Sequence, residues 1–484
     1  MKTAIIEKLT EKPAVESTAS NLNKLADSYL HNAHSALAIL RNFSQEMVDH
    51  IAHEYALVVY NQAERWAKDA VEESRLGNIP DKITKKRSKS EGIWNELKDI
   101  KTVGIIEHDP ERRLLKIAEP VGAVAGVCPC TNPVVTAMSY AMLAIKSRNA
   151  LIISAHPRSA KVTAAVVEAM LAAGKEYDLP QNAIQVITKS YPELDTLALS
   201  RAIMCKANMI IATGGANIVK VAYESGTPAY GVGAGNAPVI VHPSANITDA
   251  AKKIVNGRKF DNGIICASEQ NLIVHRDIAA RMREELEANG CYFVEDEVEL
   301  AQLKEILIDE KGHFNKDYIG QSAKHIAQHA GIAVADDMKV LVVYANSEQI
   351  GKDPYSGEKM FPMLTFFAYQ DFADAVLWSN ELLGYEGKGH TAGLHIANNS
   401  LQNEKALHYW AHTVSATHLI VNQSTATSAG GSKFNWLTAS TTLGCGTYGG
   451  TMPMEGINLS VKNLLNYKAV TLPLDAPRPG YRLI

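Results

Sequence analysis

Residues 121–158 read VGAVAGVCPCTNPVVTAMSYAMLAIKSRNALIISAHPR. Two short apolar runs in this stretch, residues 121–128 and 150–154, have the length and composition of buried β-strands. Between them, residues 136–146 have the apolar spacing of a helix. A strand–helix–strand order of this kind predicts a mostly parallel sheet with helices on both faces, and ligands of such sheets bind at the carboxyl ends of the strands.

The same alternation continues along the chain in both directions. Upstream, residues 44–77 have a helical pattern with Ser44 as its N-cap, and residues 81–89 form a polar, basic stretch. The pattern therefore predicts an α/β chain with two α/β domains. The further strands that we expect are residues 183–188, 209–212 and 238–241 and, in a second group, 272–274, 340–344, 365–368, 393–397 and 419–422.

The composition is that of a soluble globular protein. The 484 residues, 46% of them apolar and 21% charged, allow two or three domains with ordinary cores. A net charge of −4 without a long basic tract argues against nucleic-acid binding. No apolar run reaches the length of a membrane span, and the N-terminus lacks the apolar core of a signal peptide. The six cysteines follow neither a disulfide nor a zinc spacing, so we expect a cytoplasmic protein with reduced thiols and no metal.

One of those cysteines, Cys266, has the surroundings of a nucleophile. It lies in the segment DNGIICASEQ, residues 261–270, after a glycine-containing turn and before an expected strand. The thiolate is the reactive form of cysteine, and a loop at a domain junction can expose it. The alternative is that Cys266 is a small buried apolar residue, which is a common role for cysteine.

From about residue 21 to about residue 466 the chain resembles the aldehyde dehydrogenase superfamily. The resemblance is strongest to the branch that transfers its acyl product to coenzyme A. That branch includes the aldehyde dehydrogenase half of bifunctional aldehyde–alcohol dehydrogenases and the acylating succinate-semialdehyde dehydrogenases. The motifs that carry it, in the family's order, are EPVG (119–122), TNP (131–133), HP (156–157), ATGG (212–215), GVGAGN (231–236), DNGIICASEQ (261–270), EKMFP (358–362), GHT (389–391) and LGCG (443–446).

The resemblance implies three catalytic residues. Cys266 is the expected nucleophile and carries the acyl group as a thioester. Asn132 and the Cys266 backbone N–H would donate to the oxyanion that forms on attack, although an asparagine beside a proline also stabilises turns. His390 either assists proton transfer or is a hydrogen-bonded structural residue. Cys445 is expected to be a packing residue.

The resemblance also implies a Rossmann-type site for NAD or NADP. Glu358 would hold the nicotinamide ribose, and the turn after residue 212 would meet the cofactor near its pyrophosphate. The carboxylate that many relatives place near Ser159 is missing and Arg158 is close by, so the choice between NAD and NADP stays open. The expected cofactor-binding residues are Thr131, His156, Pro157, Arg158, Thr213, Gly214, Gly215, Gly233 and Glu358.

Val232 indicates which acyl acceptor is used. Hydrolytic aldehyde dehydrogenases carry a glutamate at this position, where it acts as the general base for water. Without that base, attack by water loses about 10²–10⁴-fold in rate. A thiol needs less help because it ionises closer to neutral pH. The missing glutamate therefore points to coenzyme A as a co-substrate.

The resemblance divides the chain into parts. Residues 1–20 form an N-terminal tail, either frayed or a docking peptide for a partner or a shell. Residues 21–240 form the cofactor domain, with a bridging hairpin inserted at 101–119, and residues 241–450 form the catalytic domain. Residues 451–484 return to the cofactor domain and end in an oligomerisation tail. A homodimer or homotetramer is implied.

The aldehyde is not determined by these patterns. Residues 61–64 and 93–95 resemble acylating succinate-semialdehyde dehydrogenases, whereas the nucleophile segment also resembles acetaldehyde-specific members. A sulfonated aldehyde such as sulfoacetaldehyde is a third candidate. The expected reaction is the reversible formation of acyl-CoA and NAD(P)H from aldehyde, coenzyme A and oxidised cofactor. The alternatives are a hydrolytic enzyme with another base and a non-catalytic scaffold, which the intact Cys266, Asn132 and Glu358 argue against.

Overall fold

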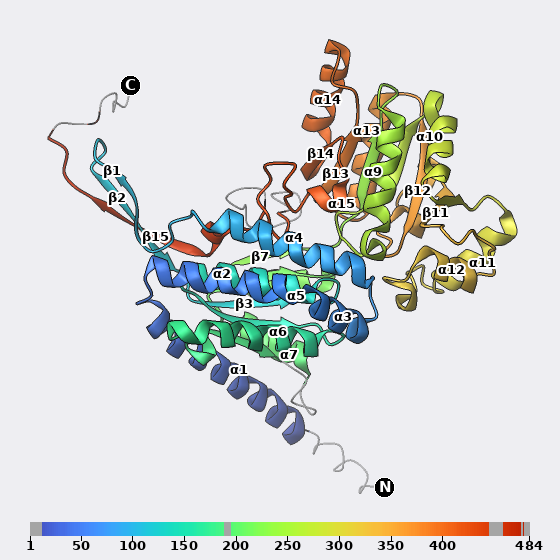
Figure 1. Cartoon of the computed structure of the whole chain (residues 1–484). Helices are drawn as coiled ribbons and strands as arrows, with labels where there is room; N and C mark the ends of the chain where they lie inside the picture. Colours follow the sequence, from blue (N-terminus) through green and yellow to red (C-terminus); the bar gives the residue numbers. More distant parts are fainter. Residues whose placement is uncertain (1–11, 188–194, 445–457, 476–477, 479–484) are drawn as a thin grey trace, which may run out of the picture.

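The structure, a computed structural model, describes residues 12–187, 195–444, 458–475 and 478, and for 12–20 only the backbone. Residues 1–11, where the predicted docking peptide would begin, and Cys445 lie outside this part. The described chain contains two parallel sheets and a projecting three-stranded sheet (Figure 1). Of the described helices, none combines the length and apolar character needed to cross a bilayer.

The first sheet has five parallel strands in the order β5-β4-β3-β6-β7. Its central strand β3 is buried along its whole length, which explains the uncharged run in its sequence. The strands are β3 (Ala123–Cys128), β4 (Ala150–Ala155), β5 (Ile184–Ile187), β6 (Met209–Thr213) and β7 (Ala229–Val232). The helices connected to them are α5 (Pro133–Lys146), α6 (Ala160–Ala173), α7 (Thr196–Met204) and α8 (Ala216–Glu224).

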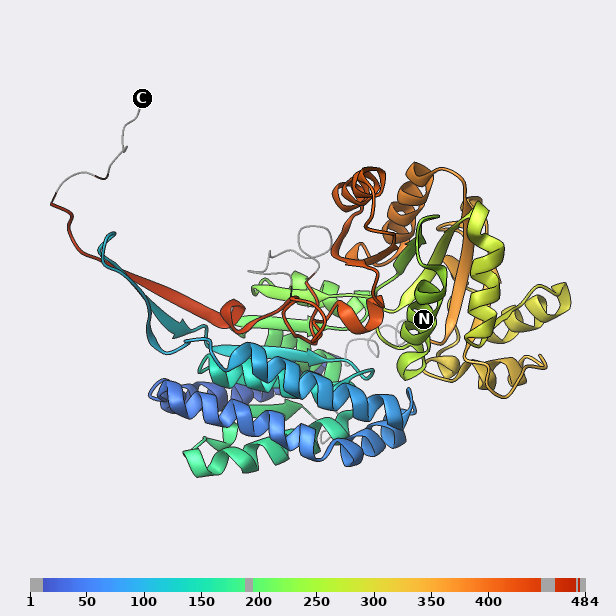
Figure 2. The same cartoon turned by 45° about the horizontal axis from the view of Figure 1, so that its top comes forward.

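Four N-terminal helices pack with this first sheet rather than with the second (Figure 2). They are α1 (Lys12–Leu40), α2 (Gln45–Asn61), α3 (Ala63–Ser74) and α4 (Ile79–Leu97). Helix α1 begins inside the segment that we predicted to be a tail. Ser44 caps α2 as predicted, but the expected helix over 44–77 is two helices that meet at Gln62. The basic stretch 81–89 is part of α4.

The second sheet has seven parallel strands in the order β10-β11-β12-β9-β8-β13-β14. Its strands are β8 (Ala237–Val241), β9 (Glu269–His275), β10 (Cys291–Phe293), β11 (Val340–Tyr344), β12 (Met363–Tyr369), β13 (Gly389–His395) and β14 (Ala416–Val421). Its helices are α9 (Ile247–Lys259), α10 (Arg276–Ala288), α11 (Glu297–Leu307), α12 (Ala323–His329), α13 (Phe372–Tyr385), α14 (Leu401–Thr413) and α15 (Thr425–Ser428).

The predicted domain boundary at residue 240 is wrong by one strand. We ended the cofactor domain at residue 240, inside β8, but β8 pairs with β9 and β13 of the seven-stranded sheet. The boundary therefore lies between β7 and β8, at residues 233–236. An apolar strand has the same sequence pattern in either sheet, because its partners are chosen by tertiary contacts rather than by local sequence.

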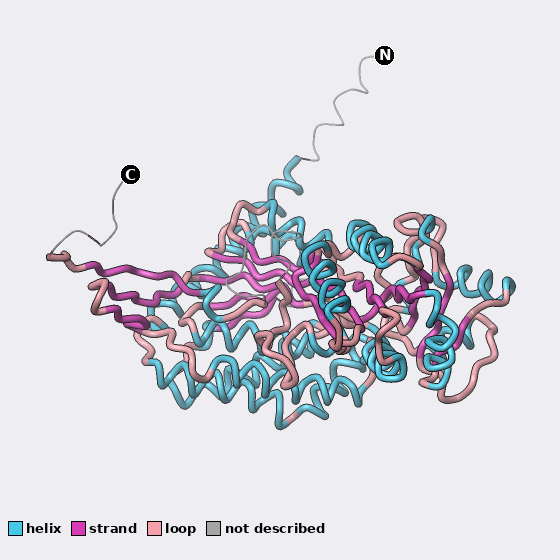
Figure 3. The backbone as a smooth tube through the Cα atoms, turned by 90° about the horizontal axis from the view of Figure 1, so that it is seen from above, coloured by secondary structure: helices cyan, strands magenta, loops and turns pink. Residues whose placement is uncertain are grey.

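The predicted hairpin at 101–119 is present and leaves the body of the molecule. Strands β1 (Gly104–Asp109) and β2 (Leu114–Pro120) are antiparallel, and β15 (Leu465–Thr471) pairs with β2. Figure 3 shows these three strands extending from one end of the molecule. Residues 465–471 therefore return to the first half of the chain, as we expected for the C-terminal segment.

Candidate active site

A cavity of about 510 Å³ lies where the loops after β3, β4 and β6 meet the segment that precedes β9. Because β3, β4 and β6 are parallel neighbours, their carboxyl ends open onto the same edge of the sheet. Most of the residues predicted for the site line this cavity, whereas Arg158 and His390 do not. Those that line it are Thr131, Asn132, His156, Pro157, Thr213, Gly214, Gly215, Gly233, Cys266 and Glu358.

Cys266 lies in a turn between a short 3₁₀ segment, Phe260–Gly263, and strand β9. The N–H of Ser268 donates to the carbonyl of Ile265 across this turn, at 2.8 Å. Gly235 lies directly against it, since a Cβ atom on Gly235 would be 1.8 Å from the Cys266 carbonyl oxygen. Only glycine permits this approach. The partly buried thiol is thus held at a defined position in the cavity wall.

Asn132 begins helix α5, yet its side chain makes no capping hydrogen bond to that helix. Its backbone carbonyl accepts the N–H of Thr136 at 3.1 Å, as an ordinary first helical bond. The side-chain amide is therefore not consumed by the helix start and is available to the cavity that it shares with Cys266. This arrangement favours the oxyanion role over the turn-stabilising one.

Val232 is 1% exposed at the end of β7. It belongs to a small apolar cluster with Ala267 and Leu443, and Cys266 packs against that cluster. Val232 therefore places hydrocarbon, and no carboxylate, beside Cys266. Among the described residues that line the cavity, Glu358 is the only carboxylate.

The start of helix α8 is suited to a phosphate group. Gly215 is its N-cap, and no side chain caps this end. Backbone N–H groups at an uncapped helix start, together with the helix dipole, favour an anion. The Thr213 hydroxyl has a different role, because it forms hydrogen bonds with the hydroxyls of Tyr140, at 2.8 Å, and Thr442, at 3.0 Å.

Glu358 is tied to the same region. The N–H of Gly235 donates to its carboxylate at 3.1 Å. Burial and the nearby Glu386 raise the pKa of Glu358 to about 8. A carboxyl group next to the nucleophile segment that faces the cavity fits the predicted contact with ribose hydroxyls.

His156 and Arg158 lie at the turn after β4. The Nδ1 atom of His156 accepts the N–H of Arg158 at 3.1 Å, and burial together with the Arg158 charge lowers the pKa of His156. His156 therefore acts as a neutral cap of this turn. The Arg158 guanidinium donates to the carbonyl of Ser74 at 2.8 Å and does not line the cavity.

A carboxylate missed by the sequence analysis lies beside this turn. Glu73, from helix α3, accepts the N–H groups of Lys161 at 2.9 Å and Val162 at 2.7 Å. These N–H groups lie in the first turn of helix α6, whose own N-cap, Ser159, makes no side-chain capping bond. Glu73 precedes them by almost ninety residues in a different helix, so no local signal marks the pairing.

His390 lies in β13 and is 1% exposed. Its Nδ1 atom forms a hydrogen bond with the Thr391 hydroxyl at 2.9 Å, and its carbonyl accepts Nδ1–H of His418 at 2.9 Å. Its Nε2 atom is buried without a hydrogen-bond partner among the described residues. Burial and His418 lower the pKa of His390 to about 3, so the ring is neutral near pH 7.

Two lysines of α4 that the sequence analysis did not select also line the cavity, Lys85 and Lys89. The ammonium group of Lys89 donates to the carbonyls of Gly430, at 2.6 Å, and Ser440, at 3.2 Å. Burial and Lys85 lower the pKa of Lys89, Cys266 raises it, and the result is about 8. The sequence does contain a signal for this pair: Lys85 and Lys89 are four residues apart, which places both on one face of a helix.

Comparisons with known proteins agree with this site. Residues 11–290 match the model of the aldehyde dehydrogenase family. A succinate-semialdehyde dehydrogenase (acetylating) of Clostridium kluyveri is 41% identical over 92% of this chain and 95% of the relative. A sulfoacetaldehyde dehydrogenase of an Acholeplasma species is 36% identical over 94% of this chain and 92% of the relative.

A solved structure extends the comparison to bound groups. It is a propionaldehyde dehydrogenase of Rhodopseudomonas palustris with bound CoA and an acylated cysteine. It superimposes with a TM-score of 0.81 at 25% identity, over 92% of this chain and 97% of that one. The family model and these long, closely similar relatives confirm the predicted resemblance: the chain belongs to the aldehyde dehydrogenase family, in its coenzyme A-acylating branch.

Proposed function

We propose that the chain converts a short anionic aldehyde, coenzyme A and NAD⁺ reversibly to an acyl-CoA and NADH, through a thioester on Cys266. The observation that carries this proposal is one cavity that combines Cys266 and Asn132 with the cofactor loops and has Val232 where a water-activating base would stand. The acylating relatives and the CoA-bound structure support the same reaction class.

In the first half of the reaction, the Cys266 thiolate bonds to the aldehyde carbon and the carbonyl electron pair moves to oxygen. The Asn132 amide and the Cys266 backbone N–H donate to that oxyanion. A bound nicotinamide accepts the hydride that leaves this carbon. The carbonyl then forms again, and the acyl group remains on Cys266 as a thioester.

In the second half, the coenzyme A thiol loses its proton to solvent and attacks the thioester. The Cys266 thiolate leaves, and the acyl group is now on coenzyme A. One thioester is exchanged for another, so the reaction runs in both directions. Attack by water is slow because the apolar Val232 side chain provides no proton acceptor.

Coenzyme A should therefore be required for steady turnover. We expect a burst of NADH no larger than one equivalent per active site without coenzyme A, followed by a rate about 10²–10⁴-fold lower than with it. The measurement is NADH absorbance after rapid mixing with aldehyde and NAD⁺. Steady NADH formation without coenzyme A, at a rate close to that with it, would contradict the proposal and favour hydrolysis.

The anionic character of the aldehyde rests on Lys89. Lys89 lines the cavity, and its ammonium group interacts electrostatically with Cys266, whose sulfur bonds to the aldehyde carbon. Thr136 and Thr441 line the same cavity, and their hydroxyls are buried without a hydrogen-bond partner among the described residues. A cation at this wall suits a carboxylate or sulfonate at the far end of a short aldehyde.

Between the two anions we favour the carboxylate of succinic semialdehyde, the substrate named for the relative that is 41% identical. Sulfoacetaldehyde is the second candidate, since it is the substrate named for the relative that is 36% identical. Acetaldehyde has no anionic group to pair with the Lys89 ammonium group. Comparing kcat/KM for the three aldehydes with coenzyme A present separates these candidates.

Glu73 should make the enzyme prefer NAD. The family resemblance puts the adenosine ribose at the turn after β4, and Glu73 caps the helix that follows this turn. Its negative charge would repel the 2′-phosphate of NADP. We expect the ratio of affinities for NADH and NADPH, measured by nicotinamide fluorescence, to fall about tenfold in Glu73→Gln.

Glu72→Gln is the matched control for that experiment, since Glu72 is an exposed neighbour that pairs with Lys68. This control should keep the ratio of the unmodified protein. Equal binding of both cofactors by the unmodified protein, or an unchanged ratio in Glu73→Gln, would contradict the assignment.

The three-stranded sheet is the surface through which we propose that the chain forms a homodimer or homotetramer. Ile105 of β1, Val470 of β15 and Leu472 beyond it are exposed apolar residues on this projecting element. An antiparallel sheet that leaves the body of the molecule with such side chains exposed is suited to cover by a second copy.

A further inference from the structure

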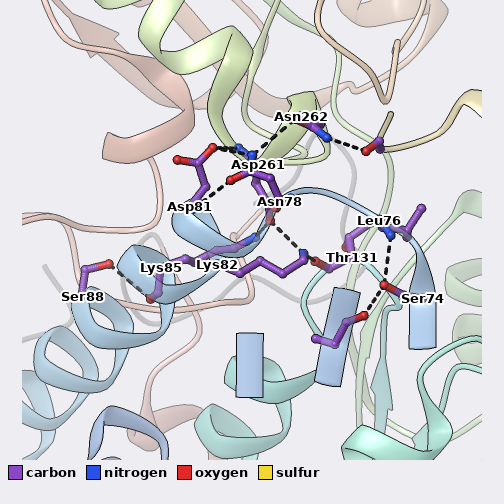
Figure 4. Close-up of polar contacts among 12 residues, drawn as sticks. Ser74, Leu76, Asn78, Asp81, Lys82, Lys85, Ser88, Thr131, Asp261 and Asn262 are labelled. Carbon is purple, nitrogen blue, oxygen red and sulfur yellow. Dashed lines mark hydrogen bonds and ion pairs between the residues drawn. The ribbon is translucent and has the colours of Figure 1, made fainter. Parts of the chain in front are cut away.

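A buried cluster of charges joins the two halves of the molecule beside the cavity (Figure 4). The Asp261 carboxylate has no solvent exposure and accepts from the ammonium groups of Lys82, at 3.0 Å, and Lys85. The N–H of Asn78 donates to the same carboxylate at 3.1 Å. Asp261 belongs to the nucleophile segment, whereas its three partners belong to α4 and its N-cap, which pack with the first sheet.

The backbone at Asp261 needs to be held in place. Asp261, Asn262 and Gly263 have φ values of 50°, 54° and 71°, so three consecutive residues are in the left-handed region. This conformation is sterically unfavourable for residues other than glycine. The N–H of Asp261 donates to Asp81 at 2.8 Å, and Asn262 donates to the carbonyl of Gly320 at 2.8 Å. These contacts stabilise the bend three residues before Cys266.

Lys82 extends the network to the other side of the cavity. Its ammonium group also donates to the carbonyl of Thr131 at 3.4 Å, next to Asn132. One buried ammonium therefore contacts both the segment that holds Cys266 and the loop that holds Asn132. Burial raises the pKa of Asp261, but Lys85 and Lys82 lower it further, so the carboxylate is ionised and the contacts are charge-assisted.

We propose that Lys82 and Asp261 are positioning residues that fix Asn132 relative to Cys266 across the junction of the two halves. Neither is among the residues that line the cavity. An oxyanion donor works only at hydrogen-bond distance from the developing charge, and a displacement of about 1 Å lowers a rate by about 10²-fold. The inference rests on the proposed roles of Cys266 and Asn132.

The test is a double-mutant cycle on the acylation of Cys266 by p-nitrophenyl acetate. This ester needs the thiolate and an oxyanion hole but no aldehyde, nicotinamide or coenzyme A, so it is independent of the overall reaction proposed above. Lys82→Met should lower the burst rate of p-nitrophenolate by about 10- to 100-fold. In a variant that already carries Asn132→Ala, the same change should cost less than about 3-fold, because the donor that Lys82 positions is gone.

Two further measurements separate positioning from loss of fold. Lys82→Met leaves the ion pair of Lys85 with Asp261 intact. We therefore expect the midpoint temperature of thermal unfolding to stay within a few degrees of that of the unmodified protein. Lys86→Met is the matched control, a buried lysine of the same helix with no hydrogen bond to Asp261 or Thr131 among the described contacts, and it should acylate at the normal rate.

The inference is overturned if Lys82→Met lowers the burst rate by the same factor in the presence and in the absence of Asn132. It is also overturned if Lys82→Met acylates at the rate of the unmodified protein. A third outcome separates the two proposals. If the double-mutant cycle gives the expected coupling between Lys82 and Asn132 but the protein shows no coenzyme A-dependent aldehyde oxidation, the inference stands and the proposed function is rejected. If the unmodified protein is not acylated at Cys266, the assignment on which the inference rests is wrong.

Discussion

Cys266→Ala should lower aldehyde turnover by about 10⁴-fold or more, since removing the nucleophile of a covalent mechanism removes the reaction path itself. The substitution takes away a partly buried thiol at the cavity wall, so the fold should persist. The measurement is the rate of NADH formation with saturating aldehyde, NAD⁺ and coenzyme A, with circular dichroism as the check on folding.

The control for this variant is Cys130→Ala. Cys130 lines the same cavity, but burial raises the pKa of its thiol and keeps it protonated near neutral pH. Cys130→Ala should therefore retain turnover within about 3-fold of the unmodified protein. Activity that survives loss of Cys266 but not loss of Cys130 would move the nucleophile to the other thiol.

The intermediate can be observed in the same pair of proteins. Incubation with an acyl-CoA and no reduced cofactor should transfer the acyl group to Cys266, because the exchange of thioesters needs no hydride. Mass spectrometry should find the acyl mass on the peptide that contains Cys266 and should find no adduct in Cys266→Ala. An adduct on another residue would contradict the thioester mechanism.

The sheets were predictable because their signal is local. A strand buried on both faces, such as β3, must be an uncharged run, and Thr131, Asn132 and Gly214 follow strand ends because parallel strands open onto one edge. The partner of a strand is not local, which is why β8 was assigned to the wrong sheet.

Helix α4 shows what local patterns cannot predict. Its lysines form the basic stretch 81–89, which suggests a solvated segment, yet Lys82, Lys85 and Lys86 are buried. The burial of Lys82 and Lys85 is compensated by a carboxylate from the other half of the chain, Asp261, and that partner exists only after folding. Glu73 was missed for the same reason.

Lys89→Met should remove the preference for an anionic aldehyde. Succinic semialdehyde and butanal differ by a terminal carboxylate, so the ratio of their kcat/KM values isolates the contact with the ammonium group. A hydrogen bond to a charged group contributes about 1.5–3 kcal/mol, which corresponds to about 10- to 100-fold in this ratio. We expect the ratio to fall by that factor in Lys89→Met. Loss of the charge beside Cys266 acts on kcat/KM for both aldehydes alike and cancels in the ratio. Lys98→Met, at the exposed end of the same helix, is the control.

The pH dependence gives an independent test of the same contact. Burial and Lys85 lower the pKa of Lys89 from 10.5 to about 8, so the ammonium group is charged below pH 8 and loses its proton above it. The ratio for the two aldehydes should therefore be constant at low pH and fall as the pH rises through about 8. Ionisation of Cys266 affects both aldehydes equally and cancels in the ratio. In Lys89→Met the ratio should be low at every pH. If the ratio keeps its pH profile in Lys89→Met, another cationic side chain binds the substrate carboxylate.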